Sequence, residues 1–179
     1  MVCFVVSLKK AKGLPNINYP VVRNGLPMEL KDKISINASK EQVYAALIDV
    51  EILRQCIPGC QELVQHSDTD LEAKVVLKVG PVKAKFSGNV QLDKAGAPDA
   101  FSLAGQGNGG AAGFAKGGAR VTLEANGDKT ILSYVASAEI GGKLAQLGSR
   151  LIQGTAKKLA GKFFEDFATI VDKHALSNP

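Results

Sequence analysis

The hydrophobic pattern of this chain changes period once, near Gly141 and Gly142. From about residue 61 up to that point, apolar and polar residues alternate, as they do throughout residues 82–92. Alternation with a period of two predicts half-buried strands of an antiparallel sheet. Beyond that point, apolar residues recur at spacings of three and four, at Leu144, Leu147, Leu151, Leu159, Phe163, Phe167 and Ile170. This spacing forms one face of a helix, so we predict an α+β fold in which a long helix follows a sheet.

The sheet is expected to contain about seven strands. Gly80 and Pro81 form a hairpin connection, and residues 126–128 supply the last turn. Because short turns join the alternating segments, we expect an antiparallel meander. The predicted strands span residues 30–36, 61–65, 71–79, 82–92, 100–105, 114–125 and 129–140.

Two short helices are predicted after the first strand, and a long one at the C-terminal end. Ser39 followed by Gln42 is a capping-box pattern, and Asp49 is placed to begin a second helix that ends before Pro58. The long helix is expected from Gly142 to about His174. It contains three glycines, which cost about 1 kcal/mol each relative to alanine and allow close backbone approach or leave room. They are Gly148, Gly154 and Gly161.

A length of 179 residues argues for one domain. Residues 1–27 contain three prolines, at positions 15, 20 and 27, and a basic cluster around Lys10, and we interpret them as a peripheral extension or the product of a misplaced start. The domain proper is predicted to span residues 28–175, and residues 176–179 are a short tail.

Charge and cysteine content narrow the classes of function. The formal net charge is +5, but four basic residues lie in the first 27, which hold no Asp or Glu, so the remainder carries +1. No basic stripe with stacking aromatic residues is evident, which argues against nucleic acid as a partner. Three cysteines are too few for a disulfide framework and indicate a reducing, cytoplasmic location. Cys56 and Cys60 lack enough neighbouring ligands for zinc, so no metal site is predicted.

Whether the sheet and the long helix enclose a cavity is left open by these patterns. Small inward residues such as Ala84, Gly88 and Ala136 fit either close packing or a pocket. The glycine-rich loop at residues 108–113 lacks the context of a phosphate-binding loop. We interpret it instead as a mobile gate in which Phe114 could plug the mouth of a pocket.

Three motifs resemble one known family. They are the sequences C-I-P-G-C at residues 56–60, V-G-P-V-K-A-K-F-S-G at 79–88 and G-G-K-L-A-Q-L-G-S-R at 141–150. Together they resemble the G-subunit family of carbon monoxide dehydrogenase, within the START-like, or helix-grip, superfamily. The resemblance implies a curved sheet wrapped around the C-terminal helix, with a hydrophobic cavity between them. It also implies an accessory protein that links a molybdenum hydroxylase to the membrane, with a quinone or lipid in the cavity and no covalently bound cofactor.

The hypothesis that follows is a non-enzymatic carrier of a quinone-like molecule. Tyr134 is placed to donate a hydrogen bond to a ligand carbonyl. Apart from Tyr134 and Arg120, the inward rows offer no group for acid-base chemistry, so no catalytic residue is assigned. A polyketide cyclase-like enzyme and an assembly factor that acts through its surface remain alternatives. The predicted ligand-binding residues are Leu77, Phe86, Val90, Phe114, Tyr134, Leu147 and Leu151.

Residues 142–164 carry five basic residues and no acidic one. They form either an ordinary solvated face or a surface for anionic lipid or an acidic redox partner. On the second interpretation, the protein contacts the inner face of the membrane peripherally and docks on a molybdenum-containing dehydrogenase. The residues predicted for this surface are Arg150, Lys157, Lys158 and Lys162.

Overall fold

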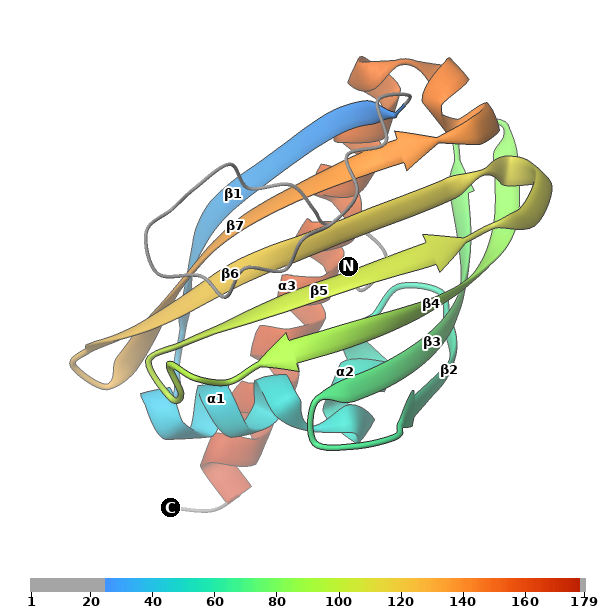
Figure 1. Cartoon of the computed structure of the whole chain (residues 1–179). Coiled ribbons are helices and arrows are strands. Elements are labelled where there is room, and N and C mark those ends of the chain that lie inside the picture. The colour runs from blue at the N-terminus through green and yellow to red at the C-terminus, as the bar shows by residue number, and fades with distance from the viewer. Residues whose placement is uncertain (1–24, 178–179) are drawn as a thin grey trace.

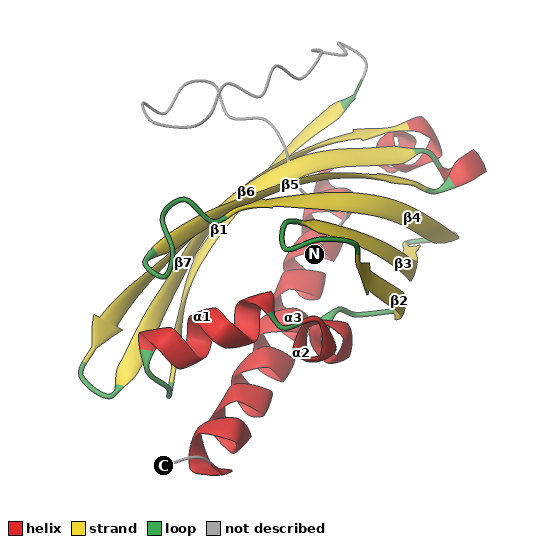
Figure 2. Cartoon of the chain, turned by 60° about the horizontal axis from the view of Figure 1, so that its bottom comes forward, coloured by secondary structure: helices red, strands yellow, loops and turns green. Residues whose placement is uncertain are grey.

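The computed structural model describes residues 25–177, with side chains described as far as Lys173. Most of the predicted N-terminal extension therefore lies outside the described residues. The chain forms one curved sheet with three α-helices on its concave side (Figures 1 and 2). The elements are β1 (Leu26–Ile36), α1 (Lys40–Ile48), α2 (Val50–Cys56), β2 (Cys60–Gln65), β3 (Asp70–Val79), β4 (Val82–Asp93), β5 (Ala100–Asn108), η1 (Gly110–Ala112), β6 (Phe114–Asn126), β7 (Lys129–Gly141), η2 (Gly142–Leu147) and α3 (Ser149–Ser177).

The seven strands form a single sheet in the order β1-β7-β6-β5-β4-β3-β2, and every neighbouring pair is antiparallel. This confirms the predicted antiparallel sheet of seven strands. The first strand begins earlier than predicted, at Leu26, and so includes Pro27. Because β1 lies at an edge of the sheet, a residue without an amide proton is tolerated there.

The capping residues read from the sequence set the starts of the two short helices. Ser39 and Gln42 form the predicted capping box at the start of α1: the Ser39 hydroxyl accepts from the Gln42 amide, and the Gln42 side chain accepts from the Ser39 amide. The Asp49 carboxylate accepts from the Glu51 and Ile52 amides and so caps α2. These bonds satisfy amides that have no partner within the helix.

The long helix begins later than predicted, at Ser149 rather than Gly142. Residues 142–147 form a separate 3₁₀ segment, and Gly148, at φ +85°, ends it. The error has a physical reason. The spacing of three between Leu144 and Leu147 fits a 3₁₀ turn as well as an α-helical one, so periodicity did not separate the two segments.

The main core lies between α3 and the concave face of the sheet (Figure 2). Phe163 and Phe167, both buried, project from α3 and stack with ring centroids 5.9 Å apart. One buried hydroxyl anchors the chain between β1 and α1, because Thr130 Oγ1 donates to the Ala38 carbonyl at 2.8 Å. Of the two roles predicted for the glycines at 148, 154 and 161, close approach or room, the structure shows room: a Cβ on any of them would meet no atom within 4 Å.

Candidate functional site

An apolar cavity of about 70 Å³ lies between α3 and the concave face of the sheet. Strands β1 and β3 to β7 supply its sheet side, and α1, α2 and α3 supply the rest. Among the lining residues, only Tyr134 carries a polar side chain. The lining residues are Leu30, Leu47, Leu53, Leu71, Val90, Leu92, Phe101, Leu103, Ala119, Val121, Leu132, Tyr134, Ala136, Ala156, Leu159, Ala160, Phe163 and Phe164.

Four alanines explain why a space remains there. Ala119 and Ala136 are direct partners across β6 and β7, and Ala156 and Ala160 are one turn apart on α3. Protein interiors are normally filled to crystal-like density, so truncated side chains on both sides of an interface leave a void. The sequence patterns left open whether small inward residues mean close packing or a pocket, and the structure shows a cavity between the sheet and α3.

Tyr134 combines an aromatic wall with the one hydroxyl of the lining. Its ring stacks on Phe164, with centroids 5.1 Å apart and planes at 22°. Its hydroxyl has no hydrogen-bond partner among the described residues. Burial raises the pKa of Tyr134 above its usual 10.0, and the negative charge of Asp32, its partner across β1 and β7, raises it further. The hydroxyl therefore stays protonated, and can donate to a ligand, through the neutral range.

The cavity is smaller than the molecule that the sequence predicts for it. An engineered cavity of about 150 Å³ holds benzene, and ligand pockets usually measure about 300–1,000 Å³. At about 70 Å³, this cavity would have to widen to admit a quinone ring.

The predicted ligand-binding residues divide into two groups. Val90 and Tyr134 line the cavity, whereas the other five are absent from its lining. The five lie toward one end of the molecule, at the β3–β4 hairpin, the 3₁₀ segments and the start of α3. Alternation identified the inward face of each strand, but it carries no information about which part of that face the helix covers. The five are Leu77, Phe86, Phe114, Leu147 and Leu151.

Two of these five pack against glycines, one in the loop after β5 and one at the end of β7. The ring of Phe86 packs on Gly109 so closely that a Cβ on that glycine would lie only 2.4 Å from it. The ring of Phe114 packs on Gly141 in the same way. Gly113 and Gly142 also approach each other backbone to backbone. The predicted gate at residues 108–113 is thus in close contact with η2. Its mobility stays a prediction.

Sequence reasoning missed most of the aromatic and helical lining. Leu159 and Phe163 belong to the periodic face of α3, and Leu47 to the apolar stripe of α1, so each had a signal for burial. Burial alone does not distinguish a cavity wall from filled core. Phe164 lies one residue off the predicted stripe, and only the structure shows it on the lining.

The four residues predicted for the basic surface also fall into two groups, those without an ion pair to a described residue and one that has two. Arg150, Lys157 and Lys158 are exposed and form no ion pair with any described residue. Lys162 differs, because its Nζ lies 2.6 Å from Asp166 Oδ1 and 3.9 Å from Glu165 Oε2. Its charge is partly neutralised within its own helix.

The two described cysteines are free thiols in apolar surroundings. Burial raises the pKa of Cys56 to about 11, and the charge of Asp166 adds to the rise. Within residues 25–173, no group of three or more His, Cys, Asp or Glu side chains is arranged to hold a metal ion.

A curved antiparallel sheet that holds a C-terminal helix over an apolar cavity defines the helix-grip, or START-like, class of fold (Figures 1 and 2). Residues 33–172 match the model of the CoxG family, the G-subunit family of carbon monoxide dehydrogenase. The chain belongs to this family.

Solved structures share this fold. A conserved protein from Geobacillus kaustophilus is similar with a TM-score of 0.77 and 30% identity, over 82% of this chain and 96% of that one. A START superfamily protein from Mycobacterium smegmatis is similar at TM-score 0.62 and 14% identity, over 81% and 97%. The Zhui aromatase/cyclase from Streptomyces sp. R1128 is similar at 0.58 and 13%, over 83% and 95%. The last two likenesses concern the fold alone.

No curated protein matches the chain. Within the described part of the chain, none of the helices has both the length and the hydropathy needed to cross a membrane.

Proposed function

We propose that the protein is a non-enzymatic carrier of a flat apolar molecule, a quinone or similar lipid, held between the sheet and α3. In this role it is an accessory protein that passes the molecule between a molybdenum-containing dehydrogenase and the inner face of the membrane. The cytoplasm is the compartment that this role requires. The family name supports the dehydrogenase as the partner, because it denotes one of the subunits of carbon monoxide dehydrogenase.

One observation carries the proposal: an apolar cavity whose single polar side chain is a protonated tyrosine without a partner among the described residues. Ligand pockets are typically apolar with a few polar groups that fix orientation. A quinone offers flat apolar faces and carbonyl acceptors, which fit the Phe164 and Tyr134 rings and the Tyr134 hydroxyl. The alanines on both sides of the cavity give room for it to widen as α3 shifts.

A cyclase-like enzyme is less well supported. Acid-base chemistry needs polar groups directed into the site, and the second candidate from the sequence, Arg120, does not line the cavity. Arg120 is exposed and pairs with Val135 and Ser102 on the outward face of the sheet. Turnover of an aromatic polyketide that is lost in Tyr134→Phe would favour the enzyme over the carrier.

The experiment is a loading assay with menadione, a small quinone, followed by native mass spectrometry and calorimetric titration. Wild-type protein should bind one menadione, with a negative heat-capacity change from apolar burial. Ala160→Leu extends a side chain into the cavity and should abolish loading. Ala168→Leu makes the same change on the same helix outside the lining, and should leave loading intact.

Failure of the wild-type protein to bind menadione or a lipid-derived quinone would contradict the carrier. Equal loss of loading in both alanine variants would contradict the assignment of the cavity. The assembly-factor alternative has a separate test: Lys157→Glu with Lys158→Glu should then abolish binding to the purified dehydrogenase while menadione loading persists.

A further inference from the structure

Two segments without acidic residues meet at one end of the molecule. Residues 73–92, which form most of β3 and β4, contain no Asp or Glu, and neither do residues 140–164, which form η2 and the first half of α3. The hairpin and the helix touch at their ends: a Cβ on Gly80 would lie 2.8 Å from Leu151 Cδ2. We call this end the basic end. It comprises Lys78, Lys83, Lys143, Arg150 and Leu151, together with the Gly80–Pro81 turn.

The basic charges of this end have no ion-pair partners among the described residues. Lys78 and Lys83 are exposed and lie directly opposite each other across the hairpin. Like charges directly opposite on neighbouring strands destabilise a sheet. Neither lysine is paired with a described carboxylate, and the same holds for Lys143 and Arg150. An arrangement that works against folding is explained if an external anion neutralises it.

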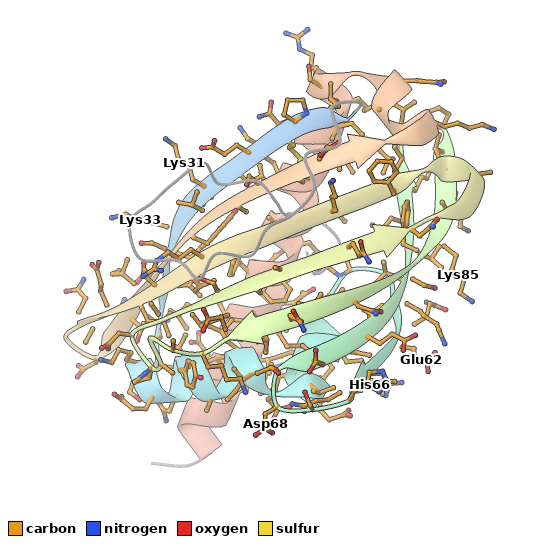
Figure 3. All side chains as sticks on the ribbon, viewed as in Figure 1. Lys31, Lys33, Glu62, His66, Asp68 and Lys85 are labelled. Carbon is orange, nitrogen blue, oxygen red and sulfur yellow. The ribbon has the colours of Figure 1, made fainter. Side chains whose placement is uncertain are left out.

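The neighbouring positions limit how far the basic end extends. Lys85 lies on the same hairpin, farther from the turn (Figure 3). Its positive charge is close enough to Glu62 to lower the pKa of that carboxyl. The main cause of that lowered pKa is the hydrogen bond from Lys74, whose Nζ lies 2.6 Å from Glu62 Oε2. Glu62 therefore offsets part of the positive charge on this part of the hairpin, whereas Lys78 and Lys83 at its tip have no described carboxylate paired with them.

An apolar side chain stands among these charges. Leu151 is 39% exposed, one of three large apolar side chains with this degree of exposure among the described residues. It directly follows Arg150 in the sequence, and its side chain packs against Gly80 of the Gly80–Pro81 turn. Basic residues around a projecting leucine fit the boundary between the phosphate headgroups and acyl chains of a bilayer.

We propose that the basic end binds the surface of an anionic phospholipid membrane, with the lysines and Arg150 on headgroup phosphates and Leu151 inserted between them. Flexible lysines on separate elements suit a fluid layer of phosphates better than the fixed carboxylates of a protein partner. The inference deepens the proposed function and rests on it, because it names the end through which the carrier meets the membrane. Helix α3 leads from there to the cavity, since Ala156 follows Arg150 by about 9 Å of helix.

The test is flotation of the full chain with two kinds of vesicle: phosphatidylcholine alone, and phosphatidylcholine with phosphatidylglycerol. Wild-type protein should bind only the second kind and dissociate in high salt. Lys78→Gln with Lys83→Gln should weaken partitioning about 30-fold, at about fivefold per basic residue near such a surface. The matched control is Lys31→Gln with Lys33→Gln, on β1 at the opposite edge of the sheet, which should retain binding (Figure 3).

A second pair of variants tests the apolar contact without altering charge. Leu151→Ser should weaken binding severalfold, whereas Val135→Ser, which removes a side chain of 40% exposure from β7, should not. All variants keep residues 1–24, whose four basic residues contribute equally to each. A variant with Lys9, Lys10 and Lys12 changed to Ser measures that contribution.

Three results would overturn the inference: no binding of wild-type protein to anionic vesicles, equal loss in the two lysine pairs, or loss only in the Lys9, Lys10 and Lys12 variant. Binding of the basic end to the dehydrogenase but not to vesicles would likewise overturn it. Menadione loading, measured in the same variants, separates this inference from the proposed function. If loading persists while vesicle binding is absent, the inference alone fails, and if vesicles bind but menadione does not, the carrier fails.

Discussion

The ring of Tyr134 on β7 stacks on the ring of Phe164 on α3, with 5.1 Å between centroids and 22° between planes. Phe164 in turn meets Phe163 edge to face at 5.1 Å, and Phe163 stacks on Phe167. Aromatic pairs of this geometry stabilise beyond their buried area, and the Tyr134–Phe164 pair holds α3 on the sheet, whereas the other two pairs lie within α3. Ala156 and Ala160, in the first half of α3, are buried but present only methyl groups to the cavity. We infer that the cavity widens by movement of that first half.

Tyr134→Phe should separate binding from stability. The ring and its stack on Phe164 remain, and only a hydroxyl without a described partner is removed, so the free energy of unfolding should stay within about 0.5 kcal/mol. Menadione affinity should fall severalfold, because one hydrogen bond to the ligand is lost. Urea titration and calorimetry measure the two quantities. Unchanged affinity would show that Tyr134 is only a wall of the cavity.

The pH dependence of loading follows from the raised pKa of Tyr134. Because burial and the charge of Asp32 both favour the neutral phenol, the hydroxyl remains a donor up to and beyond its usual pKa of 10.0. Loading of menadione should therefore be constant between about pH 6 and pH 9. A decrease centred well below pH 10 would indicate that another group controls binding.

Thr130→Val should destabilise the fold without touching the cavity. Thr130 is fully buried, and its hydroxyl donates to the Ala38 carbonyl at 2.8 Å. Valine keeps the shape and leaves that carbonyl without this donor, which should cost about 1–3 kcal/mol in unfolding free energy. Thr169→Val is the control, because the Thr169 hydroxyl bonds to Glu165 of its own helix at an exposed position. Equal effects of the two changes in urea titration would contradict this account.

The fold was predictable because its signals are local. Alternation places Phe86 and Val90 on one face of β4, and the Ser39 capping box begins α1 whatever lies around it. The start of α3 was missed because the φ of Gly148 decides it, and a glycine in sequence does not reveal its φ.

The site was less predictable than the fold because a cavity is a property of several elements at once. Leu77 and Phe86 face inward as predicted but lie beyond the part of the sheet where the cavity is. Ala156 and Ala160 carry no signal on their own. They matter only because Ala119 and Ala136 lie on the opposing sheet, a relation that one sequence does not contain.

The two described cysteines should differ in reactivity toward iodoacetamide. Thiolate is the reacting form, and burial raises the pKa of Cys56 from 9.0 to about 11, which reduces its thiolate about a hundredfold below pH 9. Burial also raises the pKa of Cys60, but the charge of Arg54 opposes this, and Cys60 is partly exposed. In a Cys3→Ser background at pH 8, peptide mass spectrometry should find Cys60 modified and Cys56 spared. Both should react in denaturant, and equal rates in the folded protein would contradict the burial of Cys56.

Three glycines at the start of and within α3 allow backbone strain to be tested without steric interference. A Cβ on Gly148, Gly154 or Gly161 would meet no atom within 4 Å, so their replacements differ only in backbone conformation. Gly154 and Gly161 lie within the helix, and alanine there should raise stability by up to about 1 kcal/mol each, or about 2–4 °C in Tm. Gly148 has φ +85°, where a side chain is strained, so Gly148→Ala should lower stability by about 1 kcal/mol. Calorimetric melting of the three variants measures these shifts. A rise in Tm for Gly148→Ala would mean that residues 142–148 can join α3 as one continuous helix, as the hydrophobic pattern alone predicts.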